Sequence, residues 1–436
     1  MRRSALVAAS VLLALGALDT VAAQQAASSP SSASVPHAPT VGATYPRGSP
    51  HSPITPAVAA RLRALLETGD GHPDVFVKVG ASATVNRNFL RCFAGPNVDL
   101  ADHDELSTTL RFFNESEHAD SFLRRSRSAT VGWHAGRAVW GSPPPLVREV
   151  RDLDPRFAIV MYGTNDIELE RPQLYASLML RLTHMLTERG VIPILSTIMP
   201  RDDSPESDRL VSLYNAVVRG VAQRRQVPLI DLHRELAALP DHGLASDGVH
   251  PNVLFEDGEP LGCDFGAEGL QHGYNIRNLL TLQALDRLRR TVIEGEAAPD
   301  APAPPPRGAG SRDHPIAIDA LPFAHSSDTS RSPHRALHTY ACGDQDESGP
   351  EVVYRVTLTE PTEIAALVAH DHRVDVDLHL LRDGECVARD DDYLALALEP
   401  GTYDFAVDTF VSASGDERSG EYLFVVGRTD RPSDPD

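Results

Sequence analysis

The sequence has little positive charge, few cysteines and almost no long apolar segments. Its 436 residues include 40 lysines and arginines against 61 acidic residues, which gives a formal net charge of −21. Phosphate backbones repel such a chain, so the charge balance disfavours a nucleic-acid-binding protein. The lack of repeated long apolar segments argues against a membrane transporter. Hydrophobic residues make up 42% of the chain, which is ordinary for a globular protein of two or three folded units.

The one long apolar run lies at the start of the chain. Arg2 and Arg3 precede the apolar residues 5–18, and Val-Ala-Ala follows at 21–23. A basic start, an apolar run and a small-residue cleavage site are typical of a secretory signal peptide. A membrane anchor is the alternative, but roughly 15 apolar residues are short for a bilayer and no basic cluster follows. We therefore expect residues 1–23 to be removed on export, leaving a secreted or periplasmic protein without stable membrane insertion.

The four cysteines show no CxxC or CxxH spacing, which disfavours a zinc site. Export permits disulfides, and four cysteines allow three pairings. Cys92 and Cys263 lie in the first large block of the chain, whereas Cys342 and Cys386 lie in the last. The pairing that respects this division is Cys92–Cys263 with Cys342–Cys386. We expect no metal and no other cofactor.

Two stretches lack apolar periodicity and divide the chain. Residues 24–54 are rich in Ser, Ala and Pro, which predicts a flexible lead-in. Residues 296–315 contain Ala-Pro-Ala-Pro-Pro-Pro, which cannot continue a helix and predicts a linker. We expect one domain over 55–295 and a second over 316–430, with few contacts between them, and a disordered tail at 431–436.

In the first domain, apolar runs of strand length alternate with helical repeats. Strands are expected at 74–80, 157–162, 192–198 and 228–231. Helices are expected at 55–66, 174–186, 210–221 and 279–288, the first of them capped by Thr55. Nearly continuous apolar strands separated by amphipathic helices predict an α/β fold with a parallel sheet covered by helices on both faces.

After the linker, the pattern changes to short strands separated by turn residues. Strands are expected at 352–359, 364–368, 374–380, 394–398, 403–407 and 422–426. The stretch from Val374 to Leu380 alternates strictly between apolar and polar residues, as a half-buried antiparallel strand does. These features predict a smaller all-β sandwich.

Three strand ends of the first domain carry polar groups that suit catalysis. Ser82 follows the first strand, and Gly163-Thr164-Asn165-Asp166 follows the second. Asp247 and His250 follow the last strand, three residues apart on a loop, so the carboxylate can reach Nδ1 of the imidazole while Nε2 faces outward. Each residue alone would be an ordinary turn, capping or surface residue. Because the carboxyl ends of parallel strands meet at one edge, the ordered set favours a serine hydrolase.

The order of these motifs resembles the SGNH (GDSL-like) hydrolase family over about residues 74–290. The resemblance implies a flavodoxin-like α/β domain that hydrolyses esters without a metal, through an acyl-enzyme. It implies that Ser82 is the nucleophile, His250 the general base and Asp247 the carboxylate that orients the histidine.

Two further roles concern the oxyanion that forms during acyl transfer. The resemblance implies that Asn165 is the side-chain donor. It also implies that Gly132, in the stretch Thr130 to Ala135, is the backbone donor, with Gly136 as the alternative. The family usually has aspartate directly before the serine, where this chain has Ala81.

The C-terminal block resembles the bacterial pre-peptidase C-terminal type of β-sandwich, through residues 352–356, 375–378, 400–403 and 420–422. The resemblance implies an accessory domain without catalysis, dispensable for small esters. Several of its aspartates form either a calcium site or, as we favour, a solvated acidic edge that discourages aggregation. They are Asp371, Asp375, Asp377, Asp390, Asp391 and Asp392.

The reading we favour is a secreted esterase or lipase-like acyl hydrolase, with a carbohydrate deacetylase as its sharpest version. Its partner is an ester substrate: a small molecule, an acylated glycan or a lipid. A secreted binding or surface-attachment protein with a degenerate hydrolase core is the alternative, and an O-acyltransferase is a third. Scattered histidines are expected to be structural or surface residues rather than zinc ligands: His134, His184, His233, His242 and His272.

Overall fold

A computed structural model describes residues 43–115, 118 and 120–433 of the chain. The expected signal peptide and the first part of the expected lead-in lie outside these residues. Among the described residues, no helix has the length and apolar character that crossing a membrane requires.

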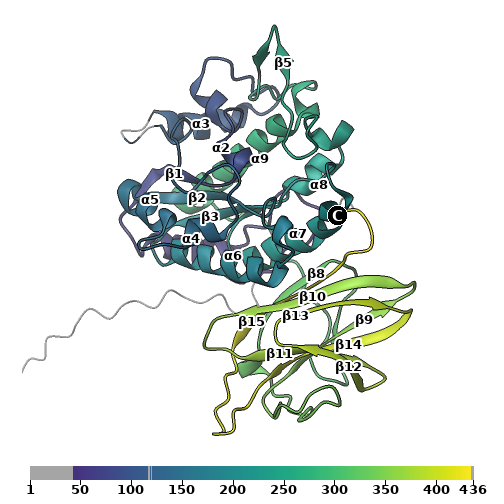
Figure 1. The fold of residues 1–436 in the computed structure, drawn as a ribbon. Coiled ribbons are helices and arrows are strands. Elements are labelled where there is room, and N and C mark those ends of the chain that lie inside the picture. The colour runs from purple at the N-terminus through teal and green to yellow at the C-terminus, as the bar shows by residue number, and fades with distance from the viewer. Residues whose placement is uncertain (1–42, 116–117, 119, 434–436) are drawn as a thin grey trace, which may run out of the picture. The chain divides into compact units, whose positions relative to one another are not determined.

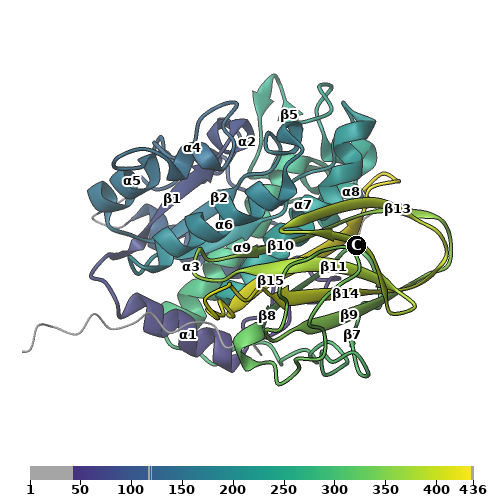
Figure 2. The ribbon, with the colours of Figure 1, turned by 60° about the horizontal axis from the view of Figure 1, so that its bottom comes forward.

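The first domain contains a parallel sheet with helices on both faces, as the periodicity predicts (Figure 1). Its strands lie in the order β1 (His72–Gly80), β2 (Pro155–Met161), β3 (Ile192–Ser196) and β4 (Leu229–Ile230). One face is covered by α1 (Pro56–Leu66), α3 (Ser107–Asn114) and α9 (Gly273–Leu288). The other is covered by α5 (Pro145–Leu153), α6 (Pro172–Thr187) and α7 (Pro205–Arg225), as Figure 2 shows.

A short segment beside β1 completes the flavodoxin-like order. Ala129 forms an isolated parallel bridge with Gly80, on the side of β1 that faces away from β2. In chain order this segment comes second, so the spatial order of the five pieces is 2-1-3-4-5. The edge strand of the fold is thus reduced to one bridge, which places residues 128–130 beside the carboxyl end of β1.

The described part of the expected lead-in is packed against the first domain rather than flexible. Tyr45 is 3% exposed, and the backbone N–H of Ala43 donates to Gln226 Oε1 at 2.8 Å. Two hydrogen bonds join Ser52 to Leu229 of β4, the last strand in the sheet order. The N–H of Ser52 donates to the carbonyl of Leu229, and the N–H of Leu229 donates to Ser52 Oγ. The expectation of flexibility is therefore wrong for residues 43–54, because a few apolar side chains among Ser and Pro are enough to anchor them.

The second domain is the predicted sandwich of two antiparallel sheets. One sheet has the order β13 (Tyr393–Leu398), β10 (Thr362–His370), β15 (Glu421–Arg428) and β8 (Phe323–Asp328). The other has the order β12 (Glu385–Asp390), β11 (Val376–Arg382), β14 (Gly401–Thr409), β9 (Val352–Leu358) and β7 (Ile316–Ala317), in which β7 pairs with β9 in parallel. The strands β7, β8 and β12 were not expected, since they are short or rich in polar residues.

Helix α7 is buried on both sides. Its side facing the first domain packs on β3, and its other side packs on β8 and β15. Gly220 lies so close to β15 that a Cβ there would be 2.6 Å from Leu423 Cδ1. Leu423 and Val425 therefore belong to the same apolar core as α7. The expectation of few contacts across the linker is wrong, because α7 packs on both domains. That residues 316–430 are dispensable for the hydrolysis of small esters stays a prediction.

The expected tail is also partly bonded. Arg431 Nη2 donates to Glu360 Oε1 at 2.6 Å. The backbone N–H of Ser433 donates to Asp208 Oδ2, at the start of α7, at 2.9 Å. Disorder is therefore wrong for residues 431–433, and the last three residues lie outside the described part of the chain.

Truncation of Leu423 should destabilise both domains. The Leu423→Ala variant removes a fully buried side chain from the shared core, which typically costs about 2–5 kcal/mol of unfolding free energy. Val387→Ala, at a residue of β12 that is 52% exposed, is the control and should change stability by less than about 0.5 kcal/mol. Urea denaturation of the full chain measures both, and equal effects of the two substitutions would contradict a shared core.

Candidate active site

The structure brings Ser82, His250 and Asp247 into one hydrogen-bonded chain. Ser82 Oγ lies 2.7 Å from His250 Nε2, and His250 Nδ1 lies 2.7 Å from Asp247 Oδ2. An ionised carboxylate only accepts hydrogen bonds, so Nδ1 carries the proton and Nε2 is free to accept from the serine hydroxyl. This is the geometry that a serine nucleophile and its general base require.

Asp247 is held in place by its own loop. Its Oδ1 accepts hydrogen bonds from the backbone N–H groups of Val249 and His250, each at 3.0 Å. Burial alone would raise the pKa of Asp247, but these bonds and the imidazole together lower it below its ordinary value. The carboxylate therefore stays ionised at neutral pH and keeps the imidazole in one tautomer.

Ser82 opens the short helix α2 (Ser82–Val85), directly after β1. The N–H groups of Thr84 and Val85 donate to the carbonyl of Ala81, each at 3.0 Å, and close the turn without a capping side chain. Gly80 is required before the turn, because a Cβ there would lie 2.6 Å from the carbonyl oxygen of Met161 on β2. The alanine at position 81 thus leaves the backbone of the turn intact.

Helix α9 stabilises this turn through hydrogen bonds from Arg277, a residue that the sequence analysis did not single out. Arg277 donates from Nη1 to the Ala83 carbonyl at 2.7 Å and from Nη2 to Thr84 Oγ1 at 3.0 Å. Its guanidinium also lies 3.7 Å from the ring centre of Phe89. Burial lowers the pKa of Arg277 to about 10, so it remains charged at neutral pH. No local pattern marks a residue whose hydrogen-bond partners lie more than 190 positions away.

The expected oxyanion loops lie beside the nucleophile turn. Gly132 sits in an exposed turn with φ of +75°, a conformation that favours glycine, and the neighbouring Val131 lines the cleft beside Ser82. Gly136, the alternative, is instead buried at the start of α4 (Gly136–Val139), where a Cβ would strike the ring of Trp140 at 2.6 Å. The placement favours Gly132 over Gly136 as a donor to a bound substrate.

Asn165 lies on the loop after β2, whose end is level with that of β1 because Gly80 pairs with Met161. Its Nδ2 donates one hydrogen bond to the carbonyl of Trp133 at 3.0 Å. An amide nitrogen carries two hydrogens, so one N–H remains for a substrate. The contact to Trp133 fixes the side chain against the loop that carries Gly132.

Asp166 joins the same two loops from a buried position. Its Oδ1 accepts from the N–H of Ala135 at 2.9 Å, and its Oδ2 accepts from the N–H of Gly163 at 3.0 Å. Burial raises the pKa of Asp166 to about 6, although both hydrogen bonds act in the opposite direction. The carboxyl group is therefore a positioning group for both loops.

Arg201 connects the Asn165 loop to the loop that carries Asp247 and His250. Its Nη1 donates to the carbonyl of Thr164 at 2.8 Å, and its Nε donates to Asp203 Oδ1 at 2.7 Å. Next to it, the N–H of Asp202 donates to the carbonyl of Gly248 at 2.9 Å. This bridge is a second feature that the sequence alone did not indicate.

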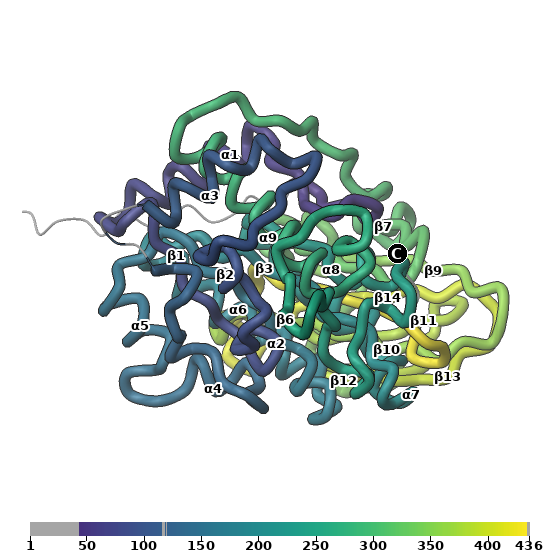
Figure 3. Tube along the Cα trace, turned by 90° about the horizontal axis from the view of Figure 1, so that it is seen from above, coloured from purple at the N-terminus to yellow at the C-terminus, as the bar shows by residue number. Residues whose placement is uncertain are grey.

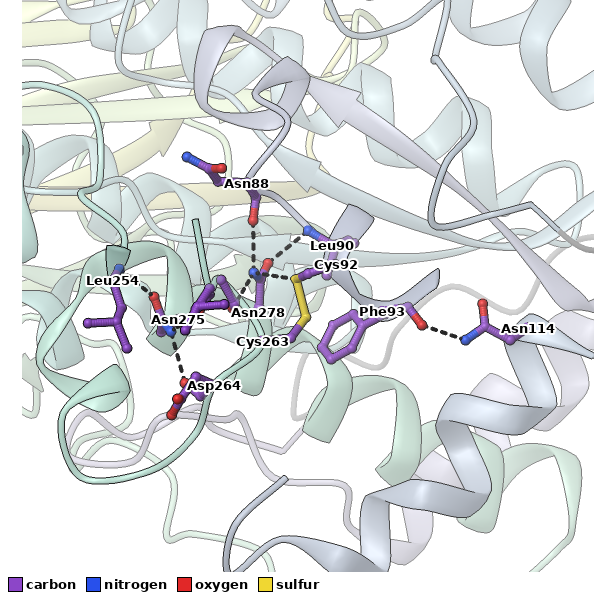
Figure 4. Close-up of a disulfide and its surroundings, with 12 residues drawn as sticks. Asn88, Leu90, Cys92, Phe93, Asn114, Leu254, Cys263, Asp264, Asn275 and Asn278 are labelled. Carbon is purple, nitrogen blue, oxygen red and sulfur yellow. Dashed lines mark hydrogen bonds between the residues drawn. A yellow bond between two sulfur atoms is a disulfide. The ribbon is translucent and has the colours of Figure 1, made fainter. Parts of the chain in front are cut away.

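The disulfide Cys92–Cys263 joins the segment after the nucleophile turn to the segment after His250, and Cys342 pairs with Cys386. The predicted pairing is therefore confirmed. Beside the first bond, Asn278 of α9 donates from Nδ2 to the carbonyls of Asn88 and Gly262, at 2.8 and 2.9 Å (Figure 4). The disulfide thus joins the segment after Ser82 to the segment after His250, and Asn278 bonds both of them to α9.

The triad opens into a cleft of about 630 Å³ at the carboxyl end of the sheet. Seen from above in Figure 3, α2 lies next to the small hairpin of β5 (Phe255–Glu256) and β6 (Glu259–Pro260). Val85 and Phe255 line the cleft from these two elements, with 44% and 56% of their surface exposed. Exposed apolar side chains next to a nucleophile form a platform for an apolar part of a substrate.

The five scattered histidines were considered above as structural or surface residues. Within the described part of the chain, the groups of three potential ligands within 4.8 Å of one another include none of the five expected structural or surface histidines. They are His134, His184, His233, His242 and His272.

A known protein family matches a part of the chain that contains most of the proposed site residues. Residues 114–254 match the model of the GDSL-like lipase/acylhydrolase family. Over these residues the chain is similar to the GDSL-like family. The match includes Gly132, Asn165, Asp247 and His250 and begins after Ser82, whose place in the site rests on the geometry. The resemblance to the GDSL-like hydrolases is confirmed over the matched residues, whereas no curated protein matches the chain.

Three solved structures are similar at low identity. An acetyl esterase variant with bound acetate ion is 15% identical, with a TM-score of 0.34, and covers 49% of this chain and 98% of its own. A carbohydrate esterase family 3 protein from Talaromyces cellulolyticus is 17% identical, also with a TM-score of 0.34, and covers 48% and 97%. The pre-peptidase C-terminal domain of a collagenase from Bacillus anthracis is 15% identical, with a TM-score of 0.18, and covers 28% and 99%.

The buried Asp166 should make stability depend on pH. Its pKa rises from an ordinary 3.8 to about 6 in the folded protein, so it favours folding while protonated and this contribution is lost as pH rises through about 6. Between pH 4 and pH 7.5 the loss amounts to at most about 3 kcal/mol. Asp166→Asn cannot ionise and should lose less unfolding free energy over the same range.

Urea denaturation of the wild type and Asp166→Asn at both pH values measures the difference, in which the contributions of all other groups cancel. Identical pH dependence of the two proteins would show that Asp166 does not titrate as the structure indicates.

Proposed function

We propose that the protein is an exported serine ester hydrolase that works through an acyl-enzyme. The observation that carries the proposal is the unbroken chain from Ser82 Oγ through the imidazole of His250 to Asp247, with both distances at 2.7 Å. The GDSL-like match supports a hydrolase of the ester type. The two disulfides support export, since such bonds persist in oxidising compartments.

In the first half of the reaction, His250 Nε2 takes the hydroxyl proton of Ser82 while Oγ attacks the ester carbonyl carbon. The resulting oxyanion accepts hydrogen bonds from the N–H groups of Ser82 and Gly132 and from the free N–H of Asn165. As the tetrahedral intermediate collapses, His250 returns the proton to the leaving alcohol and Ser82 remains acylated. Asp247 stabilises the imidazolium throughout.

In the second half, water takes the place of the alcohol. His250 removes one proton from the water, whose oxygen attacks the acyl carbon and forms a second oxyanion. Collapse releases the carboxylic acid, and the proton returns to Ser82 Oγ. An acceptor other than water would make the same site an acyltransferase.

The cleft favours an ester whose alcohol part carries hydroxyl groups. Asn86, Asn88 and Asn252 line it together with the apolar Val85 and Phe255. Amide groups match hydroxyls, whereas the apolar pair suits a methyl or a sugar face. An acetylated carbohydrate is therefore the substrate class to compare with a simple short-chain ester.

Replacing Ser82 or His250 with alanine should abolish hydrolysis of a short-chain p-nitrophenyl ester. The two residues act as one unit, so either loss should lower kcat by several orders of magnitude, on the order of 10⁴-fold or more. Circular dichroism verifies the fold, and Ser126→Ala, a half-buried serine outside the cleft, is the matched control. Wild-type turnover in folded Ser82→Ala would refute the proposal and favour a binding protein.

Asn165→Ala should show a smaller loss, concentrated in kcat. Removing one oxyanion donor lowers kcat by about 10²–10³-fold, because the hydrogen bond forms mainly in the transition state. Steady-state kinetics on the same ester separate kcat from KM. An effect on KM alone would assign Asn165 to substrate binding, and an unchanged kcat/KM would remove it from the site.

A further inference from the structure

The sandwich contains a buried cluster of polar side chains far from the triad in the sequence. Asp377 and His379 lie two residues apart on β11, so both point to the same face of their sheet. Glu347 reaches them from residues 332–351, a stretch without helix or strand that precedes β9. One ligand atom from each of the three side chains lies within 4.8 Å of the others.

This face of β11 was expected to be solvated, since apolar and polar residues alternate along the strand. Residues 332–351 cover it instead, and the side chains of Glu347 and His379 are each only 1% exposed. Leu337 and Tyr340 of the covering loop pack with Val353, Leu381 and Ala406 as a small separate core. The polar residues of the strand are therefore buried beneath a loop.

The cluster is short of hydrogen-bond partners. Both carboxylate oxygens of Glu347 and both ring nitrogens of His379 are buried without one, among the residues that the structure describes. The nearest approach between them is 3.5 Å, from His379 Nε2 to Glu347 Oε1. Asp377 Oδ2 accepts a hydrogen bond from Arg389 Nη2 at 2.7 Å. Buried polar groups without partners are costly, so such a group points to a missing ligand.

The charges around the cluster favour a cation at this position. Glu347 and Asp377 are both buried, and Arg389 donates a hydrogen bond to Asp377. A divalent cation would balance the second carboxylate, and an imidazole nitrogen of His379 offers it a lone pair.

The surroundings hold the ligands in place. The ring of Tyr340 stacks on the imidazole of His379 at 3.6 Å between centres and 9° between planes. Its hydroxyl donates to Asp408 Oδ2 at 2.5 Å. The disulfide from Cys342 to Cys386 ties the covering loop to β12, the neighbour of β11. The stacked ring therefore restricts the imidazole of His379, and the disulfide restricts the loop that carries Glu347.

We propose that Glu347, Asp377 and His379 bind one divalent transition-metal ion of the zinc class, which fastens the loop at residues 332–351 to β11. Imidazole nitrogen and carboxylate oxygen are both zinc ligands, so these three side chains can supply three of four tetrahedral positions and leave the fourth for water. Calcium needs six to eight oxygens, which this cluster does not offer. Of the six aspartates considered for calcium, only Asp377 is part of it. Asp375 pairs with Arg418, and Asp390 accepts from the N–H groups of Asp392 and Tyr393.

Metal analysis of the full-length protein tests the proposal. The protein is stripped with a chelator, dialysed against zinc sulfate and desalted, and its zinc content is measured by mass spectrometry. We expect about one zinc ion per chain in the wild type, with a melting temperature that falls on chelation and recovers with zinc. His379→Gln and Glu347→Gln should each weaken zinc binding by more than about 100-fold.

His338→Gln is the matched control, because His338 is an exposed histidine of the same loop and should leave zinc binding unchanged. A folded wild type that retains no zinc would overturn the proposal in favour of a proton shared between Glu347 and Asp377. In that case the amide of Glu347→Gln would replace the shared proton without loss of stability. Binding of calcium that survives His379→Gln would also overturn it.

Two more outcomes are decisive. Zinc that binds only after the Cys342–Cys386 bond is reduced would assign the metal to thiolates and refute the carboxylate site. If His379→Gln does not fold, zinc titration of the stripped wild type and of Glu347→Gln decides on its own.

Discussion

The contact between Ser82 Oγ and His250 Nε2 joins two residues that are 168 positions apart. The two side chains can meet only because the carboxyl end of β1 and the loop that carries His250, after β4, lie at the same edge of the sheet. The parallel order supplies that edge, and α9 supplies the support beneath it. Arg277 bonds to the nucleophile turn, and Asn278 bonds to both segments that the Cys92–Cys263 disulfide connects. The hydrogen bond between Ser82 and His250 therefore depends on the architecture of the whole first domain.

Much of this architecture could be predicted from the sequence, because it depends on short-range patterns. The four predicted strands of the first domain correspond to β1 to β4, and the predicted helices correspond to α1, α6, α7 and α9. Thr55 accepts from the N–H of Val58 as the expected cap of α1. The spacing of Asp247 and His250 predicted their hydrogen bond, since three residues on one loop limit how far the two side chains can separate.

Other features could not be predicted, because they depend on which distant segments pack together. Arg277 looks like any arginine of an amphipathic helix, and only the fold shows that it is buried under the nucleophile turn. The alternation along β11 suggested one solvated face, yet a loop with no strand pattern covers it. Residues 43–54 read as a flexible lead-in, although Tyr45 is buried, since one aromatic residue hardly changes a Ser-rich composition.

Because α7 is buried between the two domains, the sandwich cannot be gained or lost without a change in the hydrolase domain. A sandwich joined only by a proline-rich linker can be exchanged between enzymes without further change. Here β15 packs on α7 and β10 packs on α6, and this face of the sheet is apolar, with Leu367, Leu423 and Val425 in the shared core. Losing the sandwich would leave an exposed apolar patch on the hydrolase, and acquiring it requires a matching helix surface with a glycine at the point of closest approach. A substitution on either side of this interface therefore changes the packing of both domains.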